Sequence, residues 1–334
     1  MRPAVTISVA GVAARRGSSG GAQGGRAAFT LVELLVSMVI LAILAALSLA
    51  GLAGVRQGAK ADKTRNTIRK IDAVIRPMYD SYRTRRLSQA MAGASSRNYD
   101  QLLRDKRRLV IYEMPDNWND VPTPTDLAQP AFDAKFKTAA VRAYSVIRPA
   151  SSDPKPTFGS AECLYMIVER SGFDADALEF FRADEIGDVD EDGKNEFLDG
   201  WGRPIAFLRW APGFSSPVQQ LDAVNAHDPL DPMARDSTAY ALVPLIYSAG
   251  PDGALGTPTD DAIGYGLQQI NVGSDGKGWL SADRILVPAS GTPLEGLCTS
   301  PKNLFSGRRV GEVLPSTADT TALDNITNHD LTKK

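Results

Sequence analysis

The strongest candidate for metal chemistry is an acidic run between residues 188 and 199. Its oxygen-bearing residues follow the spacing of a calcium loop, with ligands at positions 1, 3, 5, 7, 9 and 12 and a glycine, here Gly193, at position 6. Alternating carboxylates let a chain wrap a hard cation, and the glycine permits the sharp turn. The expected ligands are the side chains of Asp188, Asp190, Asp192, Glu196 and Asp199 and the carbonyl of Lys194. A solvated acidic turn without metal is the alternative.

A second candidate is Glu33, a single carboxylate at the head of a long apolar run. Residues 34–55 carry no charge, and as a helix these 22 residues span about 33 Å, enough for the roughly 30 Å core of a bilayer. A charge deep in a bilayer costs about 2.5–3.5 kcal/mol, so an acid in such a run is a functional candidate. An ordinary signal anchor, with Glu33 at the interface, is the alternative, since a helix N-terminus favours an anion.

Composition favours one membrane anchor and one or two soluble domains, because 43% of the 334 residues are hydrophobic and 23% are charged. The net charge of −2 combines +13 over residues 1–108 with −15 over the remainder, a pattern that indicates basic residues beside a membrane and an acidic exported domain. Cys163 and Cys298 could pair in an oxidising compartment, and the sequence leaves this open. The sequence contains no Ser-His-Asp, zinc or phosphate-loop constellation, so we expect no enzymatic activity.

The N-terminal region closely resembles the processing site of type IV pilins and of type II secretion pseudopilins, through Ala-Phe-Thr-Leu-Val-Glu-Leu at residues 28–34. The resemblance implies that a prepilin peptidase removes a leader, residues 1–28, by cutting between Ala28 and Phe29, and that Phe29 is then methylated. The family usually has glycine where this chain has Ala28, but the registration holds because Glu33 becomes the fifth mature residue. In the family this glutamate neutralises the amino terminus of a neighbouring subunit, which implies that Glu33 directs assembly.

Two later stretches resemble the major pseudopilin of type II secretion. Residues 247–253 and 260–263 are similar to its C-terminal calcium loop, and Asp-Gly-Trp-Gly-Arg-Pro at 199–204 is similar to its Asp-Pro-Trp-Gly-x-Pro motif. The ligands that this resemblance implies are the side chains of Asp252, Asp260 and Asp261, with Ser248 or the carbonyl of Ala249. A turn without metal is the alternative here too. The acidic run at 188–199 is in turn similar to dockerin-like loops of the EF-hand type, so one or two Ca²⁺ ions are expected.

The fold class that the resemblance implies is α+β and pilin-like, with a long N-terminal helix packed on a small antiparallel-sheet head that carries inserted helices. The membrane or filament-core part of the helix covers residues 29–55, and an amphipathic continuation covers 56–88, with Pro77 kinking or ending it. The head covers residues 89–287. A tail with little periodicity, expected to be partly disordered, covers 288–334.

Local patterns predict further elements inside the head. Val55, Ala59, Ile68, Ile71, Ile75, Met78 and Tyr82 form an apolar helical stripe that should pack on the head. Helices are expected over residues 99–108, 131–145 and 161–170, the last with Ser160 as N-cap. Strands are expected over 205–210, 240–247 and, more weakly, 284–287.

The expected function is that of a structural subunit of a type II secretion pseudopilus or related type IV filament, with a calcium-stabilised head. Its partners would be further copies, other pseudopilins, the prepilin peptidase and methylase, an assembly platform and the bacterial inner membrane. Counting basic residues favours a cytoplasmic head, whereas the resemblance implies a single-pass protein with a periplasmic head, which we adopt. About 110 residues separate the helix from the Trp-Gly motif, more than in a compact major pseudopilin, so shaft and minor roles both stay open. Two alternatives also stay open, a membrane-anchored calcium-dependent enzyme and a DNA-uptake or adhesive pilin, although we expect no nucleic-acid partner.

Overall fold

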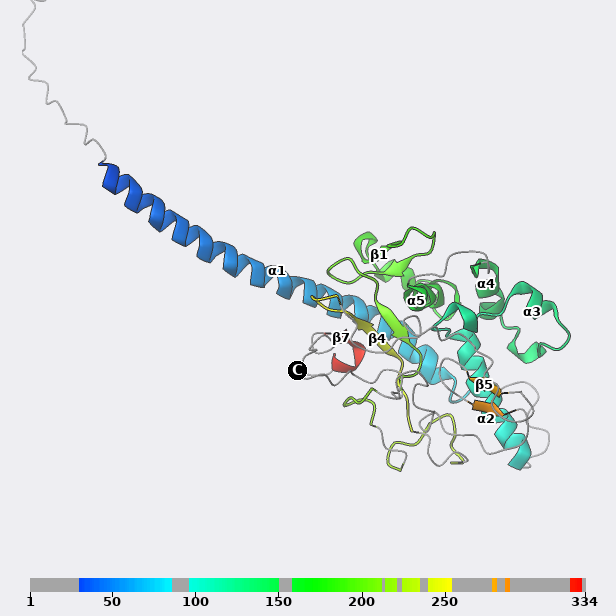
Figure 1. The fold of residues 1–334 in the computed structure, drawn as a ribbon. Helices are drawn as coiled ribbons and strands as arrows, with labels where there is room; N and C mark the ends of the chain where they lie inside the picture. The colour runs from blue at the N-terminus through cyan, green and yellow to red at the C-terminus, as the bar shows by residue number, and fades with distance from the viewer. Residues whose placement is uncertain are drawn as a thin grey trace, which may run out of the picture. The chain divides into compact units, whose positions relative to one another are not determined.

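The fold comes from a computed structural model that describes residues 30–85, 96–149, 158–211, 214–220, 224–234, 240–253, 278–280, 286–288 and 325–331. The chain divides into two compact units, residues 1–53 and residues 54–334. The residues of the second unit that follow α1 are called the head below. Helix α1 (Leu31–Ser81) begins in the first unit and ends in the second (Figure 1). The chain therefore has the predicted α+β layout, a long N-terminal helix followed by a head of short helices and strands.

The part of α1 that lies in the second unit carries a buried apolar stripe. Ile68, Ile71, Ile75 and Met78 recur at intervals of three or four residues and are at most 4% exposed, which confirms the predicted stripe from residue 68 onward. The prediction is wrong for Val55 and Ala59, which are exposed, because the head covers the helix only from about residue 61.

The helix also ends earlier than expected. The sequence predicts a helix to about residue 88, but α1 ends at Ser81 and a turn follows over residues 82–84. Pro77 lies inside the helix, which continues for only one more turn. Proline lacks a backbone N–H and so removes one hydrogen bond of the last turns, which accounts for an end close behind it.

Among the residues that the structure describes, four further α-helices and five short 3₁₀-helices follow α1. Their bounds are α2 (Ser96–Glu113), α3 (Pro124–Ala128), α4 (Ala139–Ile147) and α5 (Gly159–Arg170), with η1 (Trp118–Asp120), η2 (Ala134–Phe136), η3 (Ala177–Phe180), η4 (Ala183–Glu185) and η5 (Asn328–Asp330). The sequence predicts Ser160 as the N-cap of α5, but Phe158 holds that position. The Ser160 hydroxyl instead accepts a hydrogen bond from the backbone N–H of Phe207 at 2.9 Å and donates to its carbonyl, so it joins α5 to strand β3.

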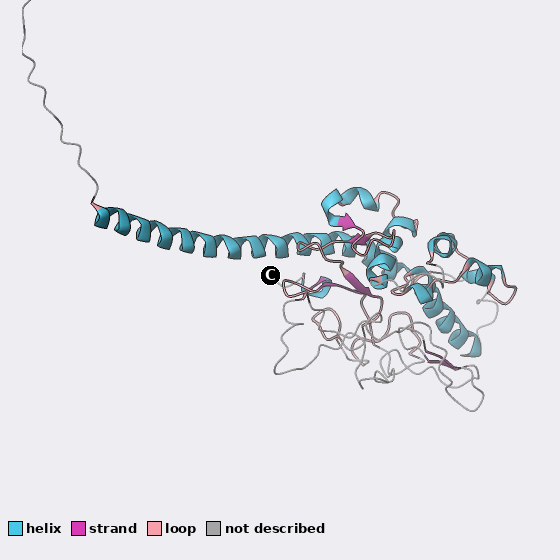
Figure 2. Cartoon of the chain, turned by 45° about the horizontal axis from the view of Figure 1, so that its top comes forward, coloured by secondary structure: helices cyan, strands magenta, loops and turns pink. Residues whose placement is uncertain are grey.

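The strands are short beside the helices and, within the described ranges, form three small antiparallel sheets (Figure 2). They are β1 (Ile186–Gly187), β2 (Glu196–Phe197), β3 (Ala206–Leu208), β4 (Leu245–Ser248), β5 (Gly278–Leu280), β6 (Leu286–Pro288) and β7 (Ile326–Thr327). β1 pairs with β2, β5 pairs with β6, and the central sheet has the order β3-β4-β7. β3 and β4 lie within the predicted runs or one residue beyond them, and every one of their residues is buried.

The central sheet takes its third strand from the C-terminal end of the chain. Ile326 pairs with Ser248 and Thr327 with Tyr247, and Asn328 and His329 are buried behind them. The sequence division ends the head at residue 287, whereas residues 325–331 are an ordered part of it. A two-residue strand has no periodicity to detect, which explains why the sequence pattern missed it.

Buried ion pairs hold the segment after α2 against β3. The Arg209 guanidinium is fully buried and lies 3.2 Å from an Asp116 carboxylate oxygen and 3.0 Å from one of Asp120. Burying both partners of an ion pair removes solvent screening, so each depends strongly on the other. Cys163 is buried in α5, and Cys298 lies outside the described residues, so their pairing stays a prediction.

Candidate functional site

The first candidate region is the N-terminal end of α1, where the helix is capped by the residue before it. The backbone N–H of Glu33 donates to the Thr30 hydroxyl at 3.2 Å, and the N–H of Leu34 donates to the Thr30 carbonyl at 3.1 Å. Glu33 therefore stands in the first helical turn, where the helix dipole stabilises a carboxylate. The predicted processing residues Ala28 and Phe29 lie outside the described residues.

The apolar surface that follows Glu33 is exposed in the isolated chain. Among the described residues, α1 is the one helix long and apolar enough to cross a membrane. None of its most apolar 18-residue window is buried, so this window is not the core helix of a soluble domain. Leu31, Met38, Leu41, Leu47 and Leu49 are all more than 60% exposed. An apolar surface of this extent requires a membrane or neighbouring helices to cover it.

A tight turn at residues 199–202 seats the head on α1. The backbone N–H of Gly200 donates to Thr64 Oγ1 at 2.8 Å, and the indole N–H of Trp201 donates to Gln57 Oε1 at 2.8 Å. A Cβ atom on Gly200 would lie only 2.1 Å from the Lys60 carbonyl oxygen, so glycine alone fits there. Gly202 has φ +80°, a conformation that glycine adopts without strain.

The carboxylate of Asp199 organises this turn. One of its oxygens accepts hydrogen bonds from the backbone N–H groups of Trp201 at 2.8 Å and Arg203 at 3.0 Å. The other accepts from the Ser248 hydroxyl at 2.7 Å. Asp199 is 1% exposed, and its assignment as the last ligand of the acidic loop stays a prediction.

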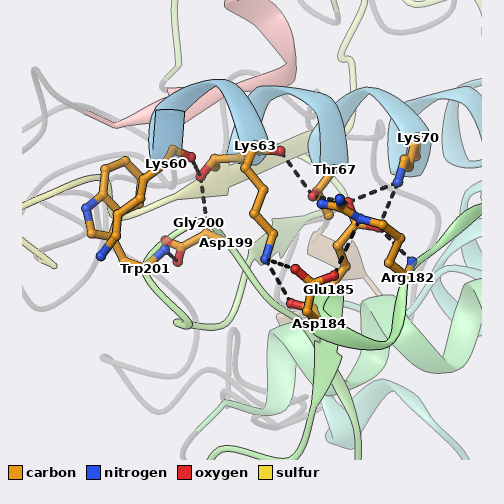
Figure 3. A network of polar contacts seen from close by, with 11 residues as sticks. Lys60, Lys63, Thr67, Lys70, Arg182, Asp184, Glu185, Asp199, Gly200 and Trp201 are labelled. Carbon is orange, nitrogen blue, oxygen red and sulfur yellow. Dashed lines mark hydrogen bonds and ion pairs between the residues drawn. The ribbon is translucent and has the colours of Figure 1, made fainter. Parts of the chain in front are cut away.

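Ion pairs at Lys63, next to Thr64, and at Lys70, two helical turns later, hold a second segment, η4, against α1. Lys63 Nζ lies 2.7 Å from an Asp184 carboxylate oxygen, and Lys70 Nζ lies 2.7 Å from one of Glu185 (Figure 3). The Thr67 hydroxyl also donates to Glu185 at 2.9 Å. Burial by itself would raise the pKa of Glu185, but hydrogen bonds from the Arg182 backbone N–H, Lys70 and Thr67 outweigh it and lower the pKa.

The acidic loop of residues 188–195 joins β1 to β2 as a hairpin rather than joining two helices. Asp188 accepts hydrogen bonds from the backbone N–H groups of Asp192 at 3.1 Å and Gly193 at 2.8 Å, which folds the loop over its own first residue. Gly193 has φ +86°, as the calcium-loop spacing requires at its sixth position. Glu196 closes the hairpin by accepting from the Val189 N–H at 3.0 Å.

Two groups of three carboxylates meet at this loop and share Asp190. In one group, Asp188, Asp190 and Asp192 each offer an oxygen within 4.8 Å of the others. In the other, Asp190 and Glu196 are joined at the same spacing by Glu162 of α5. Glu162 was not among the predicted ligands, because it is distant in sequence and looks like one polar residue of an amphipathic helix. The sequence signal that could have found it is an acid in a stretch whose neighbours, Ala161, Cys163 and Leu164, are all buried.

Burial and mutual repulsion shift the ionisation of two members of this cluster. Burial raises the pKa of Glu162 to about 8, against a hydrogen bond from the Trp118 indole, and the charges of Asp192 and Asp190 add to the increase. Burial likewise raises the pKa of Glu196 to about 7, with Asp190 and Asp188 adding to it. Carboxyl groups with such pKa values hold negative charge at neutral pH only at a cost in free energy.

A cavity of about 350 Å³ opens beside this cluster. Its lining includes Glu162, Trp118 and Lys194, with Glu169 and Arg170 from the end of α5. Lys194 places its ammonium 5.8 Å from the centroid of the Trp118 ring. Glu162 is the one member of the two carboxylate groups among the residues that line this cavity.

The second predicted calcium loop lies only partly within the described residues. Ser248, Ala249 and Asp252 are described, whereas Asp260 and Asp261 are not. The Ser248 hydroxyl donates to Asp199 and accepts from the Gly250 N–H at 3.1 Å. The Arg203 guanidinium donates to the Gly250 carbonyl at 2.8 Å, so a positive charge stands beside the described half of this loop.

Comparison with known proteins identifies the N-terminal region. Residues 24–49 match the family model of the prokaryotic N-terminal methylation motif. The chain carries a prepilin-type methylation motif. This motif spans the predicted cleavage point and Glu33 and is typical of type IV pilin-like proteins, which prepilin peptidase processes and which assemble into filaments. Pilin-like proteins are usually structural rather than enzymatic. No curated protein and no solved structure matches the chain.

Proposed function

We propose that the protein is a structural subunit of an envelope filament of the type II secretion pseudopilus kind, anchored by α1 with its head in the periplasm. The observation that carries the proposal is the methylation motif at the start of a 51-residue helix whose apolar half is exposed and whose C-terminal half is fastened to a head. A filament subunit needs both halves, because one packs among neighbouring helices and the other transmits their positions to the head.

Glu33 would set the stagger between subunits. A carboxylate at the helix start can neutralise the free amino terminus of a neighbouring subunit, an attraction that strengthens in a low-dielectric helix bundle. The resemblance of residues 199–204 to the pseudopilin Trp-Gly motif supports the pseudopilus kind, since in this chain that motif seats the head on α1. We also propose that calcium stabilises the head, with the 188–196 hairpin as the better-supported site.

The test compares Glu33→Ala with Ser37→Ala in the host bacterium. Ser37 stands one helical turn later, and its hydroxyl bonds the Glu33 carbonyl at 2.7 Å, so its substitution alters the same helix without touching the carboxylate. We expect both variants to be cleaved after residue 28, with methylated Phe29 found by mass spectrometry, and only Glu33→Ala to yield no sheared filaments. Full-length filaments from Glu33→Ala would contradict the assembly role.

The same preparations separate the alternatives. Turnover by the purified protein, lost on mutation of a clustered carboxylate, would favour a membrane-anchored enzyme, and salt-sensitive DNA binding would favour a DNA-uptake pilin. The basic helix α2 gives the DNA alternative little support. Its Arg107 is 1% exposed and lies 2.8 Å from an Asp228 carboxylate oxygen, and its Lys106 donates to the Arg83 carbonyl.

A further inference from the structure

We propose that Glu162 of helix α5 supplies the ligand that closes a calcium site in the 188–196 hairpin, in the place that loop spacing assigns to Asp199. This inference rests on the proposed calcium-stabilised head and names its ligand set. The site would combine the hairpin carboxylates with a carboxylate from a helix about 30 residues earlier. Calcium would then join two elements rather than fold one loop.

The first observation is the position of the carboxylates. Oxygens of Glu162, Asp190 and Glu196 all lie within 4.8 Å of one another. Calcium binds oxygens at about 2.3–2.6 Å, so two ligands on opposite sides of the ion are at most about 5 Å apart. Asp188 and Asp192 share Asp190 with this group at the same spacing, which brings the available ligands toward the six to eight oxygens that calcium takes.

The second observation is independent of the loop. Glu162 is 1% exposed and Glu196 is fully buried, yet Oε1 of each has no hydrogen-bond partner among the described residues. The other oxygen of each is engaged, by the Trp118 indole N–H and the Val189 N–H respectively. A buried carboxylate oxygen without a donor is costly, and a bound cation removes that cost. Each carboxylate is thus held by one oxygen and offers a second to a ligand.

The chemistry of the donors selects the class of cation. Every group in the two clusters is a carboxylate, and no histidine or cysteine belongs to either. Hard cations prefer such oxygens, whereas zinc and copper prefer imidazole and thiolate. Magnesium needs a compact octahedron with bonds of about 2.0–2.1 Å and usually keeps several waters, so flexible carboxylates with this spread favour calcium.

Asp199, the ligand that the spacing predicts, is 1% exposed and accepts three hydrogen bonds, two from the turn that seats the head on α1 and one from Ser248 of β4. Unlike Glu162, it belongs to neither of the two groups of converging carboxylates. Glu162 is held in place by α5, which packs on β2 and β3. A cation bound here would tie α5 to the β1–β2 hairpin. Because calcium would bind only the folded head, it would raise the head's stability with the logarithm of the calcium concentration once that concentration exceeds Kd.

The test titrates Ca²⁺ into the full chain purified in detergent and stripped with EGTA. Isothermal calorimetry gives the affinity, and the melting temperature reports the stabilisation. We expect Glu162→Gln to weaken Ca²⁺ binding at least tenfold and to remove most of the calcium-dependent rise in melting temperature. In EGTA the variant should melt no lower than the parent, because glutamine is close to glutamate in size and keeps an acceptor for the Trp118 N–H. This comparison distinguishes lost binding from misfolding.

The matched control is Glu169→Gln, on the same helix and lining the same cavity but outside both carboxylate groups. It should bind Ca²⁺ like the parent. Asp252→Asn, in the second predicted loop, should also keep the affinity of this site. The proposal is overturned if Glu162→Gln binds Ca²⁺ with unchanged affinity, or if the parent shows no calcium-dependent stabilisation. Neither result bears on the filament proposal, which Glu33→Ala tests separately in cells.

Discussion

At the scale of single residues, Gly200 shows how closely the head approaches its helix. Because Gly200 has no side chain, the Lys60 carbonyl oxygen can occupy the position next to its Cα. The Gly200 N–H donates a hydrogen bond to the Thr64 hydroxyl, one helical turn after Lys60. A neighbouring backbone cannot yield as a flexible side chain can. Close packing against α1, rather than an unusual backbone conformation, therefore requires glycine at position 200.

Gly200→Ala should accordingly lower the free energy of unfolding by about 3 kcal/mol, since overpacking against backbone forces the turn away from α1. Urea unfolding of the full chain in detergent, followed by tryptophan fluorescence, measures this change. Gly58→Ala is the matched control, because Gly58 lies within α1 with open space around its Cβ position. It should raise stability by roughly 0.5–1 kcal/mol through helix propensity. Equal effects of the two substitutions would disprove the packing argument.

At the scale of elements, α1 carries two different surfaces along one continuous helix. Its first part exposes apolar side chains, and its second part buries an isoleucine-rich stripe and engages the head through polar contacts. Lysines at residues 63 and 70 pair with adjacent acids of η4, yet the pairs differ in burial. The Glu185 side chain is fully buried, whereas that of Asp184 is 61% exposed.

We expect this difference to appear in double-mutant cycles. The Lys70–Glu185 pair, tested with Lys70→Met and Glu185→Gln, should show a coupling of roughly 1–3 kcal/mol, because removing either partner strands a buried group. The Lys63–Asp184 pair, tested with Lys63→Met and Asp184→Asn, should show no resolvable coupling, because water and salt screen it. A larger coupling at the exposed pair would refute the assignment of Glu185 as the electrostatic anchor.

At the scale of the whole molecule, the C-terminal segment closes the head. Asn328 donates to Asp72 of α1 at 2.7 Å and accepts from the Ile246 N–H of β4 at 2.9 Å, so it joins the helix to the central sheet. His329 is fully buried behind it, 2.8 Å from the Ser216 hydroxyl and 3.3 Å from the Pro244 carbonyl.

This closure should make stability depend on pH. Burial lowers the pKa of His329 from 6.5 to about 4, so the unfolded chain binds the extra proton first as pH falls. The contribution of neutral His329 to the free energy of unfolding, about 3 kcal/mol in total, is fully present above pH 6.5 and is lost as pH falls through about 4. His329→Gln should flatten the stability profile between these values, measured by urea unfolding at each pH. An unchanged slope in that variant would show that other groups cause the loss.

Local sequence determined the features that lie within one continuous stretch. One continuous stretch holds the methylation motif, the apolar run and the helix that carries them. These features can therefore be recognised without knowing any tertiary contact. The buried stripe from Ile68 to Met78 also follows from helical period alone. The acidic run predicted a loop with a tight turn at Gly193, and its φ of +86° agrees.

Tertiary structure alone decided which distant residues meet. Spacing assigned Asp199 to the acidic loop, whereas the fold gives Asp199 hydrogen bonds from the turn that seats the head and places a Glu162 oxygen within 4.8 Å of Asp190 and Glu196. It also drew β7 from near the chain end into the central sheet. The physical reason is that these contacts join segments from 30 to more than 250 residues apart. Their partners are chosen by packing, which no local pattern records.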